Sequence, residues 1–362
     1  MNGESGATAG TRGCGPPPIL EQEILEQPAA LARTLEGSAR ALEELAAEIR
    51  RRDVTCIMLV ARGSSDNAGV YAKYLFQAFN GIPVAMATPS LFTFHHRPPR
   101  LKDVLVLAIS QSGRSEDIGE VVAEAVRQGA LTAAITADPD SPLAARADKT
   151  LILKTGPEKA VAATKTFSSS LALVAALSAA LEKSPQRQAE VRALPELAEK
   201  TLALARQPAA EKAERYRYMS RCVVISRGFS YGIAMEVALK LKELTYVTAE
   251  AYSSADFLHG PMAMVEPGFP VILIAPSGVL IPHMMEFSAA LQERSAEIVS
   301  ISDVPAMLAR GTTRLPFAEG APEWLAPILS VIPGQLLAYH LAVAKGFDPD
   351  SPRGLRKVTV TR

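Results

Sequence analysis

Three charged side chains suited to acid–base chemistry lie along one predicted helix in the second half of the sequence. Glu236, Lys240 and Glu243 are spaced four and then three residues apart, so a helix places them on one face. A solvated, salt-bridged surface would have the same spacing. Apolar neighbours and a nearby His259, fixed by the Gly-Pro pair after it, favour a site instead. Together, carboxylate, ammonium and imidazole could move a proton on carbon, stabilise a developing anion and exchange protons near neutral pH.

A second group of polar residues, in the first half, could hold an anion. The apolar run 104–109 is followed by four side chains that form hydrogen bonds: Ser110, Gln111, Ser112 and Ser115. Ser64 and Ser65 follow the run 56–61 in the same way. At the carboxyl end of a parallel strand, the next helix offers free N–H groups and its positive dipole end to phosphate. Helix capping by serine would explain either loop alone, but two such loops on neighbouring strands favour phosphate binding.

The elements that must position these residues are short strands alternating with helices. The apolar runs 56–61, 104–109 and 131–136 each end in small polar residues, and helical patterns over 68–79 and 117–128 separate them. This alternation is typical of an α/β protein, in which helices cover both faces of a parallel sheet.

The same series of landmarks recurs further along the chain. Three pairs of residues are each separated by 165 positions: Arg62 and Arg227, Gly113 and Gly278, and Asp138 and Asp303. The constant offset predicts an internal duplication. In the second copy, Ala275 replaces Ser110 and Pro276 replaces Gln111. We therefore expect one phosphate site in each chain, in the first half.

The composition favours neither nucleic acid, nor a membrane, nor a metal as a partner. The 362 residues include 38 basic and 38 acidic side chains, so the formal net charge is zero. No apolar run reaches the ~18 residues of a membrane span, and neither a CxxC pair nor an HExxH motif is present. We expect no cofactor. Three cysteines cannot complete a disulfide framework, which favours a reducing compartment, and we expect a cytoplasmic protein.

The combined motifs resemble the sugar isomerase (SIS) family. The similarity is to the isomerase half of glucosamine-6-phosphate synthase and to isomerising glucosamine-6-phosphate deaminases that lack a glutaminase domain. The motifs that carry it run through most of the chain: 110–113, 163–165, 236–243, 249–252, 259–261 and the tail 352–357, with an early match at 23–28. The resemblance implies two tandem SIS subdomains, each a parallel sheet flanked by helices.

The resemblance and the apolar runs together predict the domain organisation. We expect a disordered tail, an N-terminal helical segment, a phosphate-binding domain, a domain with the catalytic helix and the histidine loop, and a tail over the active site. The corresponding ranges are 1–18, 19–51, 52–200, 210–345 and 346–362.

The resemblance also assigns the substrate contacts. The sugar phosphate would bind to Ser65, Ser110, Gln111, Ser112 and Ser115. Further contacts with the substrate, a hexosamine 6-phosphate, would come from Ser64, Val161 and Ala163.

Five residues would perform the chemistry. Glu243 would be the base that moves a proton between C1 and C2, and His259 would open the sugar ring in the site of a neighbouring subunit. The resemblance thus implies a homodimer. Lys357 would contact the open-chain sugar, while Glu236 and Lys240 would orient these groups. The lysines could either stabilise enediolate charge or form an imine.

Departures from the synthases point to a different reaction. Ala163 stands where many synthases have serine, and the segment 255–258 lacks the usual Gly-Glu-Leu-Lys. Residues 1–18 are too few for a glutaminase domain, so we expect glutamine not to be the ammonia source. We expect an isomerising deaminase that converts glucosamine 6-phosphate to fructose 6-phosphate and ammonia. The alternatives are an ammonia-dependent synthase, a deaminase or deglycase of another amino sugar phosphate, and a non-catalytic sugar-phosphate sensor. Retention of Glu243, His259 and Lys357 disfavours the sensor.

Overall fold

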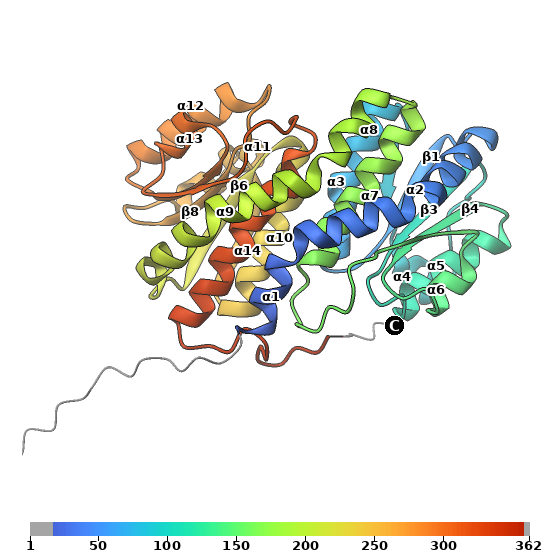
Figure 1. Ribbon diagram of the computed structural model, residues 1–362, viewed down its shortest axis with the longest axis horizontal. Helices are drawn as coiled ribbons and strands as arrows, with labels where there is room; N and C mark the ends of the chain where they lie inside the picture. Colours follow the sequence, from blue (N-terminus) through green and yellow to red (C-terminus); the bar gives the residue numbers. More distant parts are fainter. Residues whose placement is uncertain (1–16, 358–362) are drawn as a thin grey trace, which may run out of the picture.

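Two parallel sheets, one toward each end of the long axis, organise the computed structural model, which describes residues 17–357 (Figure 1). Most of the predicted N-terminal tail, residues 1–18, therefore lies outside the described residues, as does the end of the predicted C-terminal tail. Helices flank both sheets. The predicted α/β fold class with two tandem subdomains is confirmed.

The first sheet has the strand order β2-β1-β3-β4-β5, and its neighbouring strands pair in parallel. Its strands are β1 (Cys56–Val60), β2 (Val84–Met86), β3 (Val104–Ile109), β4 (Leu131–Thr136) and β5 (Lys149–Ile152). The three apolar runs of the sequence correspond to β1, β3 and β4, whose side chains are largely buried because helices cover both faces.

The second sheet repeats this topology. Its strands are β6 (Arg221–Ser226), β7 (Thr248–Ser253), β8 (Pro270–Ile274), β9 (Glu297–Ser302) and β10 (Thr313–Pro316). They too are parallel, and the order β7-β6-β8-β9-β10 corresponds strand for strand to the first sheet. The duplication inferred from the constant offset is therefore present in the fold.

Fourteen α-helices of the described chain connect and cover the strands. In the first half they are α1 (Ile19–Leu25), α2 (Gln27–Arg51), α3 (Ser64–Asn80), α4 (Pro89–Thr93), α5 (Glu116–Arg127), α6 (Pro142–Arg146) and α7 (Lys165–Glu182). The remainder are α8 (Pro185–Arg192), α9 (Leu194–Ala213), α10 (Tyr231–Thr245), α11 (Ser254–Leu258), α12 (Ile281–Glu293), α13 (Pro305–Leu308) and α14 (Ala326–Ala344). Short 3₁₀ turns occur at Glu214–Tyr216, Gly228–Ser230 and Pro261–Met264.

The two halves meet where α10 packs on α3. A Cβ at Gly232 of α10 would lie 2.6 Å from the backbone oxygen of Asn67 in α3, so glycine permits this close approach. The largest hydrophobic cluster of the described chain includes side chains from both sheets and from α2, α7, α9 and α14. One shared core thus fixes the carboxyl ends of the first sheet relative to α10.

Helix α14 is long and apolar enough to cross a membrane, although the sequence analysis predicted no such segment. Its mean hydropathy over the most apolar window is 1.4, and 89% of that window is buried inside the protein. It packs against α9 and α10. These contacts account for its apolar surface as that of a core helix.

Candidate active site

A cavity of about 350 Å³ opens at the carboxyl ends of the first sheet. Its walls contain all five residues predicted to bind phosphate, namely Ser65, Ser110, Gln111, Ser112 and Ser115. They also contain the predicted substrate contacts Ser64, Val161 and Ala163, and three predicted catalytic residues: Lys240, Glu243 and Lys357. Segments far apart in the sequence therefore meet in one pocket.

The loop between β3 and α5 is shaped to receive an anion. Gly113 has a φ of 61°, and a Cβ there would lie 2.2 Å from the hydroxyl of Ser141, so only glycine fits. The N–H groups of Gly113 and Arg114 donate to the hydroxyl oxygens of Ser110 and Ser112 at 3.2 and 3.3 Å. Each hydroxyl hydrogen thus stays available to a ligand oxygen.

Ordinary helix capping does not account for the serines of this pocket. Ser115 occupies the N-cap position of α5, but its side chain makes no capping hydrogen bond. On the neighbouring strand the N-cap of α3 is Gly63, with Ser64 and Ser65 inside the first turn of the helix. Helix α3 therefore begins four residues earlier than the predicted range 68–79, and this extension places both serines in the cavity wall.

The charged stripe of α10 is buried, not solvated. The side chains of Glu236, Lys240 and Glu243 are 0%, 1% and 22% exposed. The Lys240 ammonium lies 2.5 Å from a carboxylate oxygen of Glu243 and 3.3 Å from one of Glu236. A salt-bridged surface is thereby excluded. Glu236 stands behind the cavity wall, whereas Lys240 and Glu243 line the cavity.

Residues of α3 hold Glu236 from the other half of the molecule. The Ser64 hydroxyl and the Asn67 amide donate to its two carboxylate oxygens at 2.9 and 2.8 Å. Sequence reasoning assigned Ser64 to the substrate and gave Asn67 no role. The available signal was that Asn67 lies three residues after Ser64, on the same face of a helix. These bonds join α10 of the second half to α3 of the first half.

Burial and charge act in opposite directions on this cluster. Burial raises the pKa of Glu236, against the lowering effects of the Lys240 charge and of the hydrogen bonds from Asn67 and Ser64. Burial alone would lower the pKa of Lys240, but the Glu236 and Glu243 carboxylates outweigh it, and the pKa is raised. The two carboxylates thus favour the ammonium form of Lys240, which is suited to stabilising an oxyanion.

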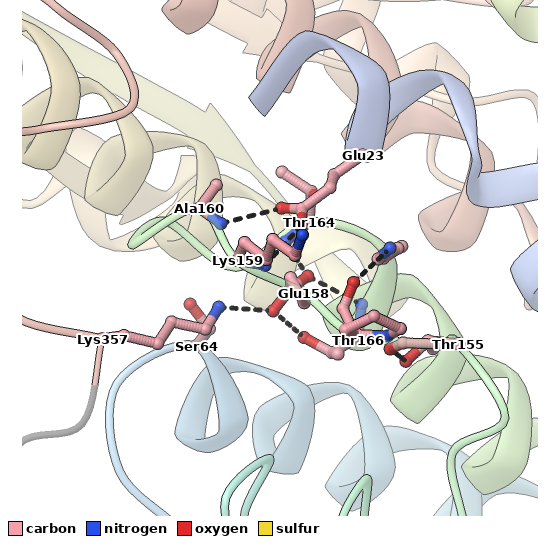
Figure 2. A network of polar contacts seen from close by, with 12 residues as sticks. Glu23, Ser64, Thr155, Glu158, Lys159, Ala160, Thr164, Thr166 and Lys357 are labelled. Atoms are coloured by element: carbon pink, nitrogen blue, oxygen red, sulfur yellow. Dashed lines mark hydrogen bonds and ion pairs between the residues drawn. The ribbon is translucent and has the colours of Figure 1, made fainter. Parts of the chain in front are cut away.

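A buried carboxylate that sequence reasoning missed, Glu158, lines the same cavity, and Figure 2 shows its polar contacts. The Lys357 ammonium donates to an oxygen of Glu158 at 2.8 Å. Glu158 also accepts from the N–H groups of Thr164 and Thr166 and from the Thr166 hydroxyl. Burial opposes ionisation of Glu158, but the Lys357 charge and these hydrogen bonds prevail and lower its pKa. The only sequence signal was its position five residues before the 163–165 motif.

Arg62 adds a cation to the cavity wall that the sequence marked only as a landmark of the duplication. Its Nε donates to the buried carboxylate of Asp117 at 2.7 Å. It lies two residues after the end of β1, close to the serines that begin α3. Its charge therefore lies where a phosphate would benefit from it.

His259 lies outside this cavity. It follows α11, is exposed to solvent, and its backbone N–H donates to Asp256. The chain does not bring it together with Glu243, and its predicted role in a neighbouring subunit remains a prediction.

At the corresponding loop of the second half, Ala275, Pro276 and Glu323 line a space of only about 10 Å³. The N–H and hydroxyl of Ser277 donate to the Asp303 carboxylate at 2.7 and 2.5 Å. The N–H of Val279 donates to Glu323 at 3.0 Å, and a Cβ at Gly278 would meet the Glu323 carboxyl at 2.2 Å. The protein's own carboxylates fill this loop.

Comparisons with known proteins agree with this geometry. The sequence profile of the SIS domain family matches residues 45–180 and 217–345. A glutamine–fructose-6-phosphate aminotransferase (isomerizing) from Thermococcus kodakarensis is 37% identical over 357 residues, which are 96% of this chain and 58% of that relative. The chain thus spans somewhat more than half the length of this curated relative.

Solved structures share the whole fold. A protein of Silicibacter pomeroyi DSS-3 described as a phosphosugar isomerase superposes with a TM-score of 0.84 at 32% identity, covering 92% of this chain and 100% of that one. The glucosamine-6-phosphate deaminase of Thermotoga maritima superposes with a TM-score of 0.76 over 95% of this chain and 100% of that one. At 22% sequence identity, this superposition shows a common fold and no more.

Proposed function

The chain belongs to the SIS domain family, and from that premise we propose that it is an isomerising deaminase of glucosamine 6-phosphate. The products would be fructose 6-phosphate and ammonia. The observation that carries this proposal is one cavity that combines an anion-binding loop with the Lys240–Glu243 pair. A sugar phosphate needs both parts, one for its phosphate and one for proton transfer near its other end.

In this proposal the first half binds and the second half reacts. The phosphate accepts hydrogen bonds from the serine and glutamine side chains of the loop, and His259 of a second subunit opens the ring. The Glu243 carboxylate then removes the proton from C2 and returns it to C1. The oxygen at C1 gains a proton and the nitrogen at C2 loses one, so the 2-amino aldose becomes a ketose imine with a hydroxyl at C1. The Lys240 ammonium stabilises the negative charge that develops on the oxygen at C1.

Water completes the proposed reaction. It adds to the imine carbon at C2, the C–N bond breaks, and ammonia leaves as the ketone forms. One molecule of glucosamine 6-phosphate and one of water thus give one of fructose 6-phosphate and one of ammonia. Because a catalyst accelerates both directions, the same residues would also support amination by free ammonia. The name of the Thermococcus relative, which contains fructose 6-phosphate, supports this substrate pair.

A panel of hexosamine and hexose 6-phosphates tests the proposal. Ammonia and ketose phosphate are measured together in each reaction. Equal amounts of both products from glucosamine 6-phosphate are expected. Ketose phosphate formed only from a hexose 6-phosphate would identify a plain phosphosugar isomerase, the reaction named for the Silicibacter neighbour. Binding without turnover of any member would identify a sensor.

The homodimer and the cytoplasmic location also remain predictions. Sedimentation equilibrium and fractionation of the source cells measure them directly. A monomer that is fully active would contradict the proposed sharing of His259.

A further inference from the structure

Glu158 is a fully buried charge that the proposed chemistry does not use. It lies between β5 and α7, with its side chain 0% exposed. Three donors besides Lys357 fix it: the Thr164 N–H at 3.0 Å, the Thr166 N–H at 3.1 Å and the Thr166 hydroxyl at 2.7 Å. Held this way, the carboxylate has little freedom to rotate, and one oxygen is presented to the tail.

Lys357 depends on this carboxylate for its place. Within residues 17–357, the Lys357 ammonium forms one ion pair, with Glu158. The lysine side chain is 24% exposed. The nearest other anchor of the tail is at Arg353, whose N–H donates to the Tyr246 hydroxyl at 2.6 Å and whose guanidinium lies over the Tyr246 ring. Nothing in that anchor reaches the cavity, so the Glu158 contact is what brings Lys357 to it.

The ion pair stands in a wall between two cavities. Glu158 and Lys357 line the sugar-phosphate cavity and also a neighbouring cavity of about 700 Å³. Gln111 and Ser112 are shared in the same way, and Arg33 belongs to the outer cavity alone. Separation of Glu158 from Lys357 would therefore join the two cavities into one larger space.

We propose that Glu158 is a positioning residue: it holds the Lys357 ammonium across the mouth of the sugar-phosphate cavity and closes that cavity against the outer one. Its effect on catalysis rests on the proposed function, but its hold on the tail does not. A closed wall keeps water from the carbanion-like intermediate during transfer between C1 and C2. It also presents the Lys357 charge to the open-chain sugar.

The chain offers a matched control on the same loop. Glu23 of α1 accepts hydrogen bonds from the N–H groups of Lys159 and Ala160, the two residues after Glu158, and makes no contact with Lys357. Glu23→Gln therefore weakens the support of this loop without removing the charge that attracts the tail. Any effect of Glu158→Gln that Glu23→Gln reproduces is structural.

Limited digestion of the full-length protein by trypsin, followed by mass spectrometry, measures the hold on the tail. Trypsin cuts after Arg356, next to Lys357. Glu158→Gln should accelerate that cut about tenfold or more, because removal of one member of a buried ion pair strongly favours the open tail. Glu23→Gln should leave it near the wild-type rate. An unchanged rate in a folded Glu158→Gln protein would overturn the proposal.

Lys357→Met keeps the test decisive if Glu158→Gln does not fold. It should accelerate the same cut to a similar extent, and the double variant should show no further acceleration. Full additivity, or no effect of Lys357→Met, contradicts a tail held through this pair.

Deuterium exchange during turnover measures the catalytic consequence. With an active substrate in deuterated water, Glu158→Gln should raise severalfold the label incorporated at C1 or C2 per product formed, and Glu23→Gln should not. A purely structural role would lower turnover without changing that ratio, and this result would overturn the closure of the cavity. If no sugar phosphate is turned over by the wild type, the proposed function fails while the digestion result still decides the hold on the tail.

Discussion

The loops at the carboxyl ends of β3 and β8 occupy equivalent places in the two halves. They differ in whether their polar groups face a cavity or are bonded to carboxylates of the protein. The first leaves serine and glutamine side chains around a cavity of about 350 Å³, with Ser115 making no capping bond. The second satisfies its N–H groups with Asp303 and Glu323 and leaves about 10 Å³. Both offer the positive end of a helix to an anion. In the second half that anion belongs to the protein itself, so only the first half is open to a ligand.

The difference explains how a duplicated fold can place one site in each chain. The half with the filled loop contributes α10, whose Lys240 and Glu243 line the cavity of the other half. Contacts of Ser64 and Asn67 with Glu236 hold that arrangement across the interface between halves. In the proposed function, binding and proton transfer are divided between the copies, so substitutions in each half should have different kinetic effects.

The largest effect is expected at Glu243. Glu243→Gln keeps the shape and hydrogen-bonding reach of the side chain but removes the base, so kcat should fall about 10²–10⁴-fold while substrate still binds. Steady-state kinetics with a titration of substrate binding measure both quantities. Glu286→Gln, at an exposed position of α12, is the matched control and should behave as wild type. Near-normal turnover by Glu243→Gln would place the base elsewhere.

A mixture of two inactive variants tests whether His259 acts across subunits. His259→Ala and Glu243→Gln chains that exchange freely should recover about a quarter of the wild-type rate, because half of the dimers are mixed and each mixed dimer holds one intact site. The rate is measured before and after mixing, with chain exchange followed by native mass spectrometry. No recovery despite exchange would rule out a shared site.

The two loops should respond differently to loss of a serine. Ser112→Ala removes a donor to a charged oxygen and should raise KM about ten- to a hundredfold. Ser277→Ala, at the equivalent position, removes a bond to Asp303, so it should lower the melting temperature and leave KM unchanged. Kinetics and thermal unfolding of both variants measure this contrast. Equal increases in KM would mean that both loops bind substrate.

The sequence predicted the parts of the site that depend on local spacing. The apolar runs located β1, β3 and β4, and the spacing of Glu236, Lys240 and Glu243 placed these side chains on one face of a helix, because a strand or a helix alone fixes such relations. The contacts that were missed join distant segments. Asn67 and Glu236 are 169 residues apart, and Glu158 and Lys357 are 199 apart. Only tertiary packing brings these pairs together, and the spacing of residues along the sequence does not indicate which distant residues will pair.

The pH dependence of stability should reveal that the buried Glu158 carboxylate is stabilised by its hydrogen bonds and by its ion pair with Lys357. Its pKa is lowered in the folded protein, so its contribution to the free energy of unfolding is fully present above the unfolded value of about 4.3. The contribution disappears as the pH falls through the folded value. The stability difference between wild type and Glu158→Gln, measured by urea unfolding, should be about 1 kcal/mol or more near pH 7 and should shrink below pH ~4. A difference that grows toward acid pH would contradict the lowered pKa.

The smallest effect, and the most direct test of the comparison, is expected at Glu323. Glu323→Ala removes the carboxylate that accepts from the Val279 N–H, and the loss of this charged acceptor should destabilise the protein by about 1–2 kcal/mol. If Glu323 occupies the place of a ligand anion, inorganic phosphate should restore part of the lost melting temperature, beyond its effect on wild type. Glu319→Ala, at an exposed residue of the same segment, is the control and should gain nothing from phosphate. Because both loops present N–H groups at the start of a helix, the emptied second loop should now bind the anion that the first loop binds. Equal stabilisation of wild type and Glu323→Ala by phosphate would show that the filled loop has lost this capacity for another reason, and the replacement of Ser110 and Gln111 by Ala275 and Pro276 would then be the cause.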